Sequence, residues 1–167
     1  GNKVLYLAFE LSAQQIKQRY SNDNANFYCF NDNLLRHNSE VMNEEELFDF
    51  LLSSITQYQV NTIIIDNISY MSNGLESGTN ALMLMKWLNE TKKDFNISVL
   101  LIAHTKKRNN KYIITSDDLA GSKKIINFCD SAFCIGRSNI NQSEIYLKQI
   151  KVRNGEFKYT ADNVMVG

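Results

Sequence analysis

The chain has 167 residues and no formal net charge; 44% of its residues are hydrophobic and 22% are charged. Zero net charge means that no overall field draws the chain to nucleic acid or membrane, so such binding has to come from a local patch. No apolar run approaches the roughly 20 residues of a membrane span, and no signal peptide is visible. The three cysteines have no metal-ligand spacing. We therefore expect a cytoplasmic protein with reduced cysteines and a single domain over residues 1–167.

Hydrophobic periodicity predicts alternating strands and helices in the first two thirds of the chain. In chain order these are a strand at 4–9, a helix at 12–20, a strand at 26–30, a helix at 43–58, a strand at 62–66, a helix at 79–92 and a strand at 97–103. Ser12 and Asn43 are the predicted N-caps, the second with Glu46 in a capping box. The remainder predicts a helix from Asp117 or Asp118 to 128, then strands at 132–136, 144–152 and 157–166.

Alternating strands and helices indicate an α/β fold with a mostly parallel, twisted sheet and helices on both of its faces. The three successive strands at the end of the chain predict an antiparallel extension at one edge.

Polar residues follow three of the predicted strands. Ile63–Ile65 is a β-branched run typical of a buried parallel strand, and Asp66 follows it directly. Open α/β sheets place ligands at this end of their strands. A carboxylate here resembles a Walker B aspartate, which holds Mg²⁺ beside nucleotide phosphates; the alternative is a partner for a helix dipole.

Glu10 and His104 end the other two strands. Glu10 could take a proton from an attacking water, or only favour the start of the following helix. The imidazole of His104 could hydrogen-bond a γ-phosphate, or be structural. His37 lies in a polar stretch, and we expect it at the surface.

Two basic segments follow. Lys106, Lys107, Arg108 and Lys111 form a loop that could contact nucleic-acid phosphates or simply be solvated. Lys151 and Arg153 lie at a spacing of two, on one face of a strand. They could reach a phosphate held by a neighbouring subunit, or keep an exposed edge strand soluble.

No Gly-x-x-x-x-Gly-Lys-[Ser/Thr] occurs in the sequence, so the chain has no P-loop to cradle the β- and γ-phosphates.

Together these segments resemble the RecA-type P-loop ATPase core, in the branch of the hexameric replicative (DnaB-like) helicases and their RadA-like relatives. The resemblance lies in Val4–Ser12, in Ile63–Asp66, in Leu101–His104, in the Asp118-Leu-Ala-Gly-Ser122 helix that runs to Asp130, and in Lys151-Val-Arg-Asn-Gly155. Asn67 and Ala120 differ from the residues common in helicases. The segment Tyr146–Arg153 also resembles ATPases of bacterial mobile elements.

The resemblance implies ATP and Mg²⁺ as cofactors and an upstream P-loop strand and helix before Gly1. It makes Glu10 the general base, Asp66 the Mg²⁺ ligand (directly or through water) and His104 the γ-phosphate sensor. Lys151 and Arg153 become fingers that act in the neighbouring subunit of a ring or filament. Loops at 72–78 and 106–114 would face single-stranded DNA.

The resemblance therefore implies an ATPase that couples hydrolysis to DNA binding or unwinding in replication, recombination or mobile-element transfer. We expect this fragment alone to be inactive. The alternatives are a non-catalytic RecA-fold assembly or DNA-loading module, and a nucleic-acid binder that uses the basic loop.

Overall fold

A computed structural model describes residues 3–20, 27–31, 44–68, 78–107, 112–119 and 124–167. The chain divides into two compact units. The first comprises Gly1–Asn73 and Trp87–Ala103, and the second comprises Gly74–Lys86 and His104–Gly167. The expected single domain stays a prediction.

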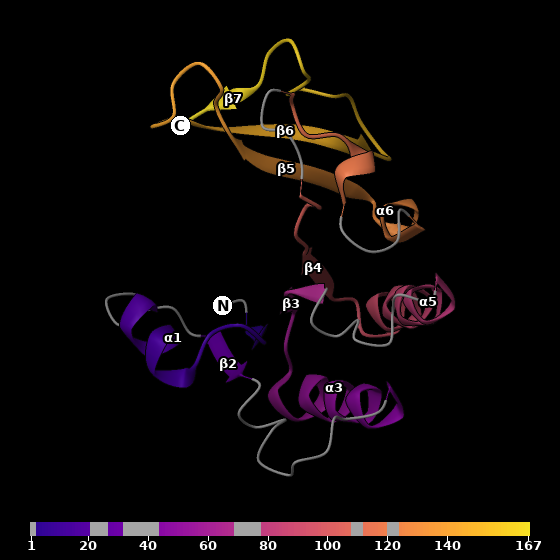
Figure 1. The fold of residues 1–167 in the computed structure, drawn as a ribbon. Coiled ribbons are helices and arrows are strands. Elements are labelled where there is room, and N and C mark those ends of the chain that lie inside the picture. Colours follow the sequence, from indigo (N-terminus) through magenta and orange to yellow (C-terminus); the bar gives the residue numbers. More distant parts are fainter. Residues whose placement is uncertain (1–2, 21–26, 32–43, 69–77, 108–111, 120–123) are drawn as a thin grey trace. The chain divides into compact units, whose positions relative to one another are not determined.

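The first unit is built on a four-stranded parallel sheet in the order β2-β1-β3-β4 (Figure 1). The strands are β1 (Val4–Ala8), β2 (Phe27–Asn31), β3 (Thr62–Asp66) and β4 (Ser98–Ile102). Their bounds lie within two residues of the predicted ones. Parallel strands need crossover connections, which the intervening helices supply.

Helix α1 (Ala13–Tyr20) covers one face of this sheet. Its Ile16 packs with Tyr6 and Ala8 of β1, and Ile64 of β3 lies against this cluster. The predicted cap is confirmed: Ser12 Oγ accepts a hydrogen bond from Gln15 N at 3.3 Å, and Ser12 N donates to Gln15 Oε1 at 2.9 Å. This reciprocal pair satisfies two backbone N–H donors at the start of the helix.

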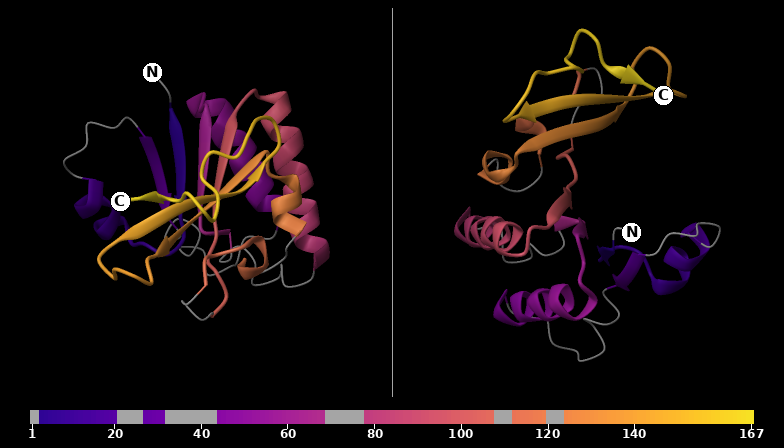
Figure 2. Two further views of the ribbon diagram at one scale, coloured as in Figure 1. Left: turned by 90° about the horizontal axis from the view of Figure 1, so that it is seen from above. Right: turned by 180° about the vertical axis from the view of Figure 1, so that it is seen from behind.

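Helices α3 (Glu44–Tyr58) and α5 (Gly78–Asp94) lie on the other side of the sheet from α1 (Figures 1 and 2). Of the β1 and β3 side chains that alternate with the α1-facing set, Leu5, Ile63 and Ile65 are each 0% exposed. Phe48 of α3 and Trp87 of α5 stack with their ring centroids 4.3 Å apart. The predicted helices on both faces are thus confirmed. The predicted cap at Asn43 lies outside the described residues.

The second unit contains a separate antiparallel sheet in the order β5-β6-β7. Its strands are β5 (Ser131–Arg137), β6 (Ile145–Val152) and β7 (Met165–Val166). The antiparallel strands were expected, but they form a sheet of their own in the described residues and do not extend the parallel one.

Two predictions in this unit are wrong. The helix predicted from Asp117 or Asp118 is a 3₁₀ turn, Ser116–Asp118, followed after Leu119 by a separate helix α6 (Lys124–Phe128). The reason is that Leu119 has extended backbone angles and pairs with Thr105 in an antiparallel bridge.

The last predicted strand is also shorter than expected, because much of 157–166 is a loop with its own hydrogen bonds. Gln149 Oε1 accepts from the backbone of Lys158 and Tyr159 at 2.7 and 3.1 Å, and Asn163 Oδ1 accepts from Thr160 N at 2.9 Å. These side chains satisfy backbone donors that a longer strand would otherwise pair.

The α/β architecture implied by the RecA resemblance is confirmed. Among the helices of the described segments, none has the length and apolar character that a membrane crossing requires.

Candidate functional site

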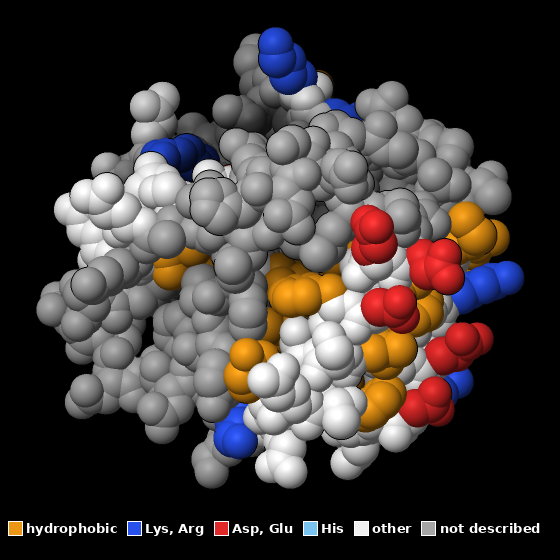
Figure 3. Space-filling view, turned by 90° about the horizontal axis from the view of Figure 1, so that it is seen from below, with side chains coloured by type: hydrophobic (Ala, Val, Ile, Leu, Met, Phe, Trp, Pro, Cys, Tyr) orange, Lys and Arg blue, Asp and Glu red, His pale blue; other side chains and the backbone are white. Residues whose placement is uncertain are grey.

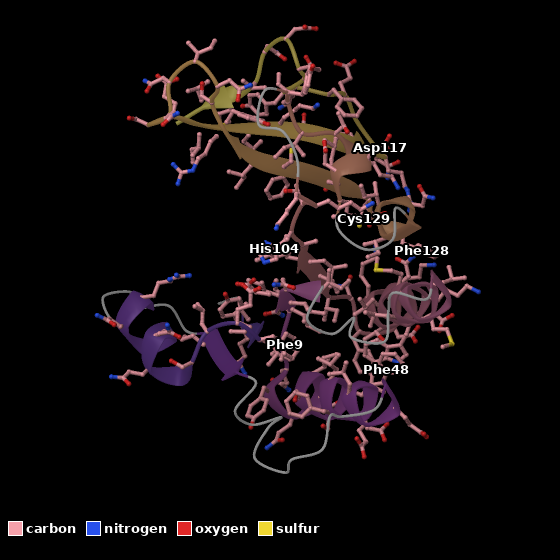
Figure 4. The ribbon with its side chains drawn as sticks, in the orientation of Figure 1. Phe9, Phe48, His104, Asp117, Phe128 and Cys129 are labelled. Atoms are coloured by element: carbon pink, nitrogen blue, oxygen red, sulfur yellow. The ribbon has the colours of Figure 1, made fainter. Side chains whose placement is uncertain are left out.

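The candidate site lies at the carboxyl ends of β1 and β3 in the first unit. These strands pair in parallel register as far as Ala8 and Asp66. Beyond that pair, Phe9 N donates to Asp66 O at 2.8 Å, so the backbones stay joined where the strands end. Phe9, marked in Figure 4, is buried and immediately precedes Glu10. The next residues of both strands therefore begin at the same edge of the sheet.

Glu10 and Asp66 are each held by a neutral hydrogen-bond donor. Asn67 Nδ2 donates to Glu10 Oε1, and the Tyr6 hydroxyl donates to Asp66 Oδ2 at 2.5 Å. Asn67 is only 1% exposed, whereas Glu10 is exposed and Asp66 is half-buried. Since Asp66 and Asn67 are consecutive, one strand end positions both carboxylates.

The carboxylate oxygens of Glu10 and Asp66 are of the ligand type that Mg²⁺ prefers. Mg²⁺ prefers oxygen ligands and is usually held by one or two carboxylates together with water and substrate phosphates. Asp66 is a half-buried carboxylate at the end of β3, which is the chemical class of such a ligand. Within the described segments, no group of three or more His, Cys, Asp or Glu side chains could hold a metal ion.

The third predicted residue, His104, belongs to the second unit. It is exposed and follows the last residue of β4 by two positions (Figure 4). Its place beside the two carboxylates stays a prediction.

Backbone contacts of Thr105 and Lys106 fix the start of the basic loop in the second unit. Thr105 forms the bridge to Leu119, and Lys106 N donates to Asp118 O at 2.8 Å. The side chains of Lys106 and Lys107 are exposed. Arg108 and Lys111 lie outside the described residues, as do the loop glycines Gly74 and Gly121.

Lys151 and Arg153 are brought together at the carboxyl end of α6. Lys151 Nζ donates to Ile126 O at 2.6 Å and to Asn127 O at 2.9 Å, and Arg153 NH2 donates to Asn127 O at 3.0 Å. Arg153 also forms an ion pair with Asp130 at 2.9 Å. Cations are favourable where the last helical carbonyls lack partners, so both residues have a structural role in this chain. Their predicted role in a neighbouring subunit stays a prediction.

Acidic side chains mark a surface that does not suit nucleic acid. The outer side of α3 exposes Glu45, Glu46 and Asp49, and Figure 3 shows acidic side chains gathered beside hydrophobic ones on that face. A phosphate backbone would be repelled there.

Asn67 and Tyr6 are the site residues that sequence reasoning missed. Tyr6 lies inside a strand and is 7% exposed, so its pattern is that of a core residue. Asn67 did carry a signal, because a polar amide directly after a Walker B-like aspartate differs from the residues common in helicases.

The family of the chain follows from its sequence. Residues 1–110 match the model of a family described as an AAA domain. That range includes β1, β3 and β4, and with them Glu10, Asp66 and His104. No curated protein shows a significant match. The chain belongs to this AAA domain family, a family of P-loop ATPases that includes RecA-like and DnaB-like members.

Proposed function

We propose that this chain is the ATP-hydrolysing core of a DNA-associated motor of RecA type that works as an oligomer. The observation that carries the proposal is the pair Glu10 and Asp66 at the ends of adjacent parallel strands, joined through Asn67. A base and a metal-binding carboxylate at one sheet edge are what the hydrolysis of a nucleoside triphosphate needs.

In this proposal Glu10 accepts a proton from the attacking water. A carboxylate has about four lone-pair positions, so the hydrogen bond from Asn67 leaves it capacity to accept another. Asp66 holds Mg²⁺, directly or through water. The bound metal would neutralise phosphate charge and help to align the phosphates.

Other residues contribute after assembly. His104 donates a hydrogen bond to the γ-phosphate and so detects its loss. Lys151 and Arg153 reach the nucleotide of a neighbouring subunit, where a planar guanidinium matches phosphate oxygens in two hydrogen bonds. Their shared position at the end of α6 supports a joint role, since one movement of this end of β6 would carry both.

Single-stranded DNA is the proposed partner of the basic loop. The exposed Lys106 and Lys107 support this, because a neutral protein needs a local cluster of cations to bind phosphates. The acidic outer side of α3 is poorly suited to the same partner.

The proposal is tested by steady-state ATP hydrolysis in the intact protein that contains this chain, with and without single-stranded DNA. Glu10→Gln should lower kcat by at least about 100-fold, the usual contribution of a general base. Arg153→Ala should lower it by about 1,000-fold or more if the guanidinium stabilises the transferred phosphoryl group. The matched controls are Glu90→Gln and Arg137→Ala, exposed residues of the same charge that lie on α5 and β5.

The result that refutes the proposal is hydrolysis at the wild-type rate in both Glu10→Gln and Arg153→Ala. An intact protein that binds DNA but neither binds nor hydrolyses ATP would be the non-catalytic module instead. If the basic loop alone provided the function through about four phosphate contacts, log affinity for DNA would fall with log salt at a slope of roughly −3 to −4, whether or not ATP were present.

A further inference from the structure

Asn67 is the most buried polar side chain at the carboxyl end of the parallel sheet. It is 1% exposed, and only two other polar residues in the described core, Ser54 and Thr91, are buried, each 4% exposed. A buried amide is retained only where its donors and acceptors find partners. One of those partners is the carboxylate of Glu10.

The contact joins a fixed residue to a flexible one. Asn67 follows β3, whose last residue Asp66 is held by the ladder to β1 and by Phe9 N at 2.8 Å. Glu10 is exposed and carries a long side chain with several rotatable bonds. The hydrogen bond to Oε1 removes much of that freedom and sets the direction of the carboxylate.

The chemistry of the donor also matters. A lysine or arginine in the same place would hold the carboxylate equally well, but its positive charge would weaken the carboxylate as a base. An amide is neutral and cannot itself lose a proton in the working range. It therefore orients the carboxylate without neutralising it.

We infer that Asn67 is a positioning residue that holds the carboxylate of Glu10 in the direction from which it takes a proton from water. This inference rests on the proposed function, since it assigns Asn67 a role only through Glu10. It predicts that Asn67 acts on the chemical step and not on nucleotide binding.

The kinetic test uses Asn67→Leu in the intact protein, because leucine keeps the number and branching of the side-chain heavy atoms and removes the donor. We expect kcat to fall by about 10- to 100-fold, with the KM for ATP and the affinity for a non-hydrolysable ATP analogue within about twofold of wild type. The matched control is Thr91→Val, which also replaces a buried polar residue of the same unit by an apolar one of similar shape. In a Glu10→Gln background the effect of Asn67→Leu should disappear, because the two residues act as one unit.

A second measurement needs neither nucleotide nor a substitution of the buried residue. The side-chain amide resonances of Asn67 in a ¹⁵N-labelled protein should shift and exchange faster with water in Glu10→Ala, and should stay in place in Glu90→Ala. This outcome would support the contact even if Asn67→Leu failed to fold.

Three results overturn the inference. The first is a kcat in Asn67→Leu that equals or exceeds that of wild type. The second is a loss of activity that appears wholly in KM. The third is that the side-chain amide resonances of Asn67 remain unchanged in Glu10→Ala. If Glu10→Gln lowers kcat while Asn67→Leu does not, only the positioning role fails. If Glu10→Gln has no effect either, the general-base role that the proposed function gives to Glu10 fails as well, and a wild-type rate in Arg153→Ala too would refute the proposed function as a whole.

Discussion

The hydrogen bond between Tyr6 and Asp66 offers a direct energetic test of the site. The hydroxyl of Tyr6 lies 2.5 Å from Asp66 Oδ2, and the tyrosine is 7% exposed. Tyr6→Phe removes this donor and keeps the ring that packs against Ala8 and Ile16. The change therefore measures the hydrogen bond with little loss of apolar contact.

The expected loss follows from the type of bond. Hydrogen bonds to charged groups contribute about 1.5–3 kcal/mol to stability. Because Asp66 is half-buried, water can replace part of the lost bond, so we expect the free energy of unfolding to fall by about 1.5 kcal/mol. With a urea dependence of about 2 kcal/mol per molar, the unfolding midpoint should drop by roughly 0.7 M. The corresponding fall in Tm is about 3–6 °C for a chain of this length.

The chain provides its own reporter for this measurement. Trp87 is the only tryptophan, lies in the same unit as Tyr6, and stacks on Phe48 at 4.3 Å. Urea unfolding followed by tryptophan fluorescence therefore reports the unit that contains the site. The control is Tyr159→Phe, which removes a hydroxyl that makes no hydrogen bond in the described part of the chain.

A double-mutant cycle identifies the partner. In an Asp66→Asn background the acceptor is neutral, so Tyr6→Phe should cost less than in wild type, about 1 kcal/mol or below. An unchanged midpoint in Tyr6→Phe would refute the reasoning, and so would an equal loss in both backgrounds, because the charge of Asp66 would then add nothing to the hydrogen bond.

Three further changes test other contacts. Gly136→Ala should lower stability by about 1–3 kcal/mol in thermal unfolding, because its Cβ would lie 2.5 Å from ring atoms of Tyr146, which is buried; unchanged stability would mean that the ring can move aside. Ser12→Ala should cost about 1 kcal/mol in urea unfolding through loss of the α1 cap, and no loss would contradict the cap. Asp130→Asn should cost less than about 1 kcal/mol at low salt and less still at high salt, since its pair with Arg153 is exposed; a larger, salt-independent loss would contradict a surface pair.

The parallel sheet could be predicted from the sequence because its signals are local. The β-branched run Ile63–Ile65, which lies before an aspartate, predicts a buried strand, and both Ile63 and Ile65 are 0% exposed. The same reasoning placed Glu10 and Asp66 at one edge, since the carboxyl ends of parallel neighbours meet there. To predict that these two residues lie close together, only the order and direction of the strands were needed.

The partners of the site residues could not be predicted, because they depend on contacts between distant parts of the chain. Tyr6 and Asp66 are separated by 60 positions, and Glu10 and Asn67 by 57. In the second unit, Leu119 is extended because it pairs with Thr105, and this pairing ends the helical pattern that the local sequence favours. Tertiary pairing overrides propensity at such positions.

The contacts of Arg153 within its own chain are compatible with the role proposed for it between subunits. Its ion pair with Asp130 is exposed on both sides, at 45% and 53% of the two side chains, and such pairs contribute only about 0–1 kcal/mol. A phosphate group accepts charge-assisted, bidentate hydrogen bonds from a guanidinium, which are among the strongest that proteins form. The free energy lost when Arg153 leaves Asp130 is therefore much smaller than the free energy that a contact with phosphate would contribute. Lys151, which donates two hydrogen bonds to the end of α6 and is less exposed, is the more firmly held of the two. It follows that Arg153 loses its exposed ion pair at a lower cost in free energy than Lys151 loses its two hydrogen bonds to the end of α6.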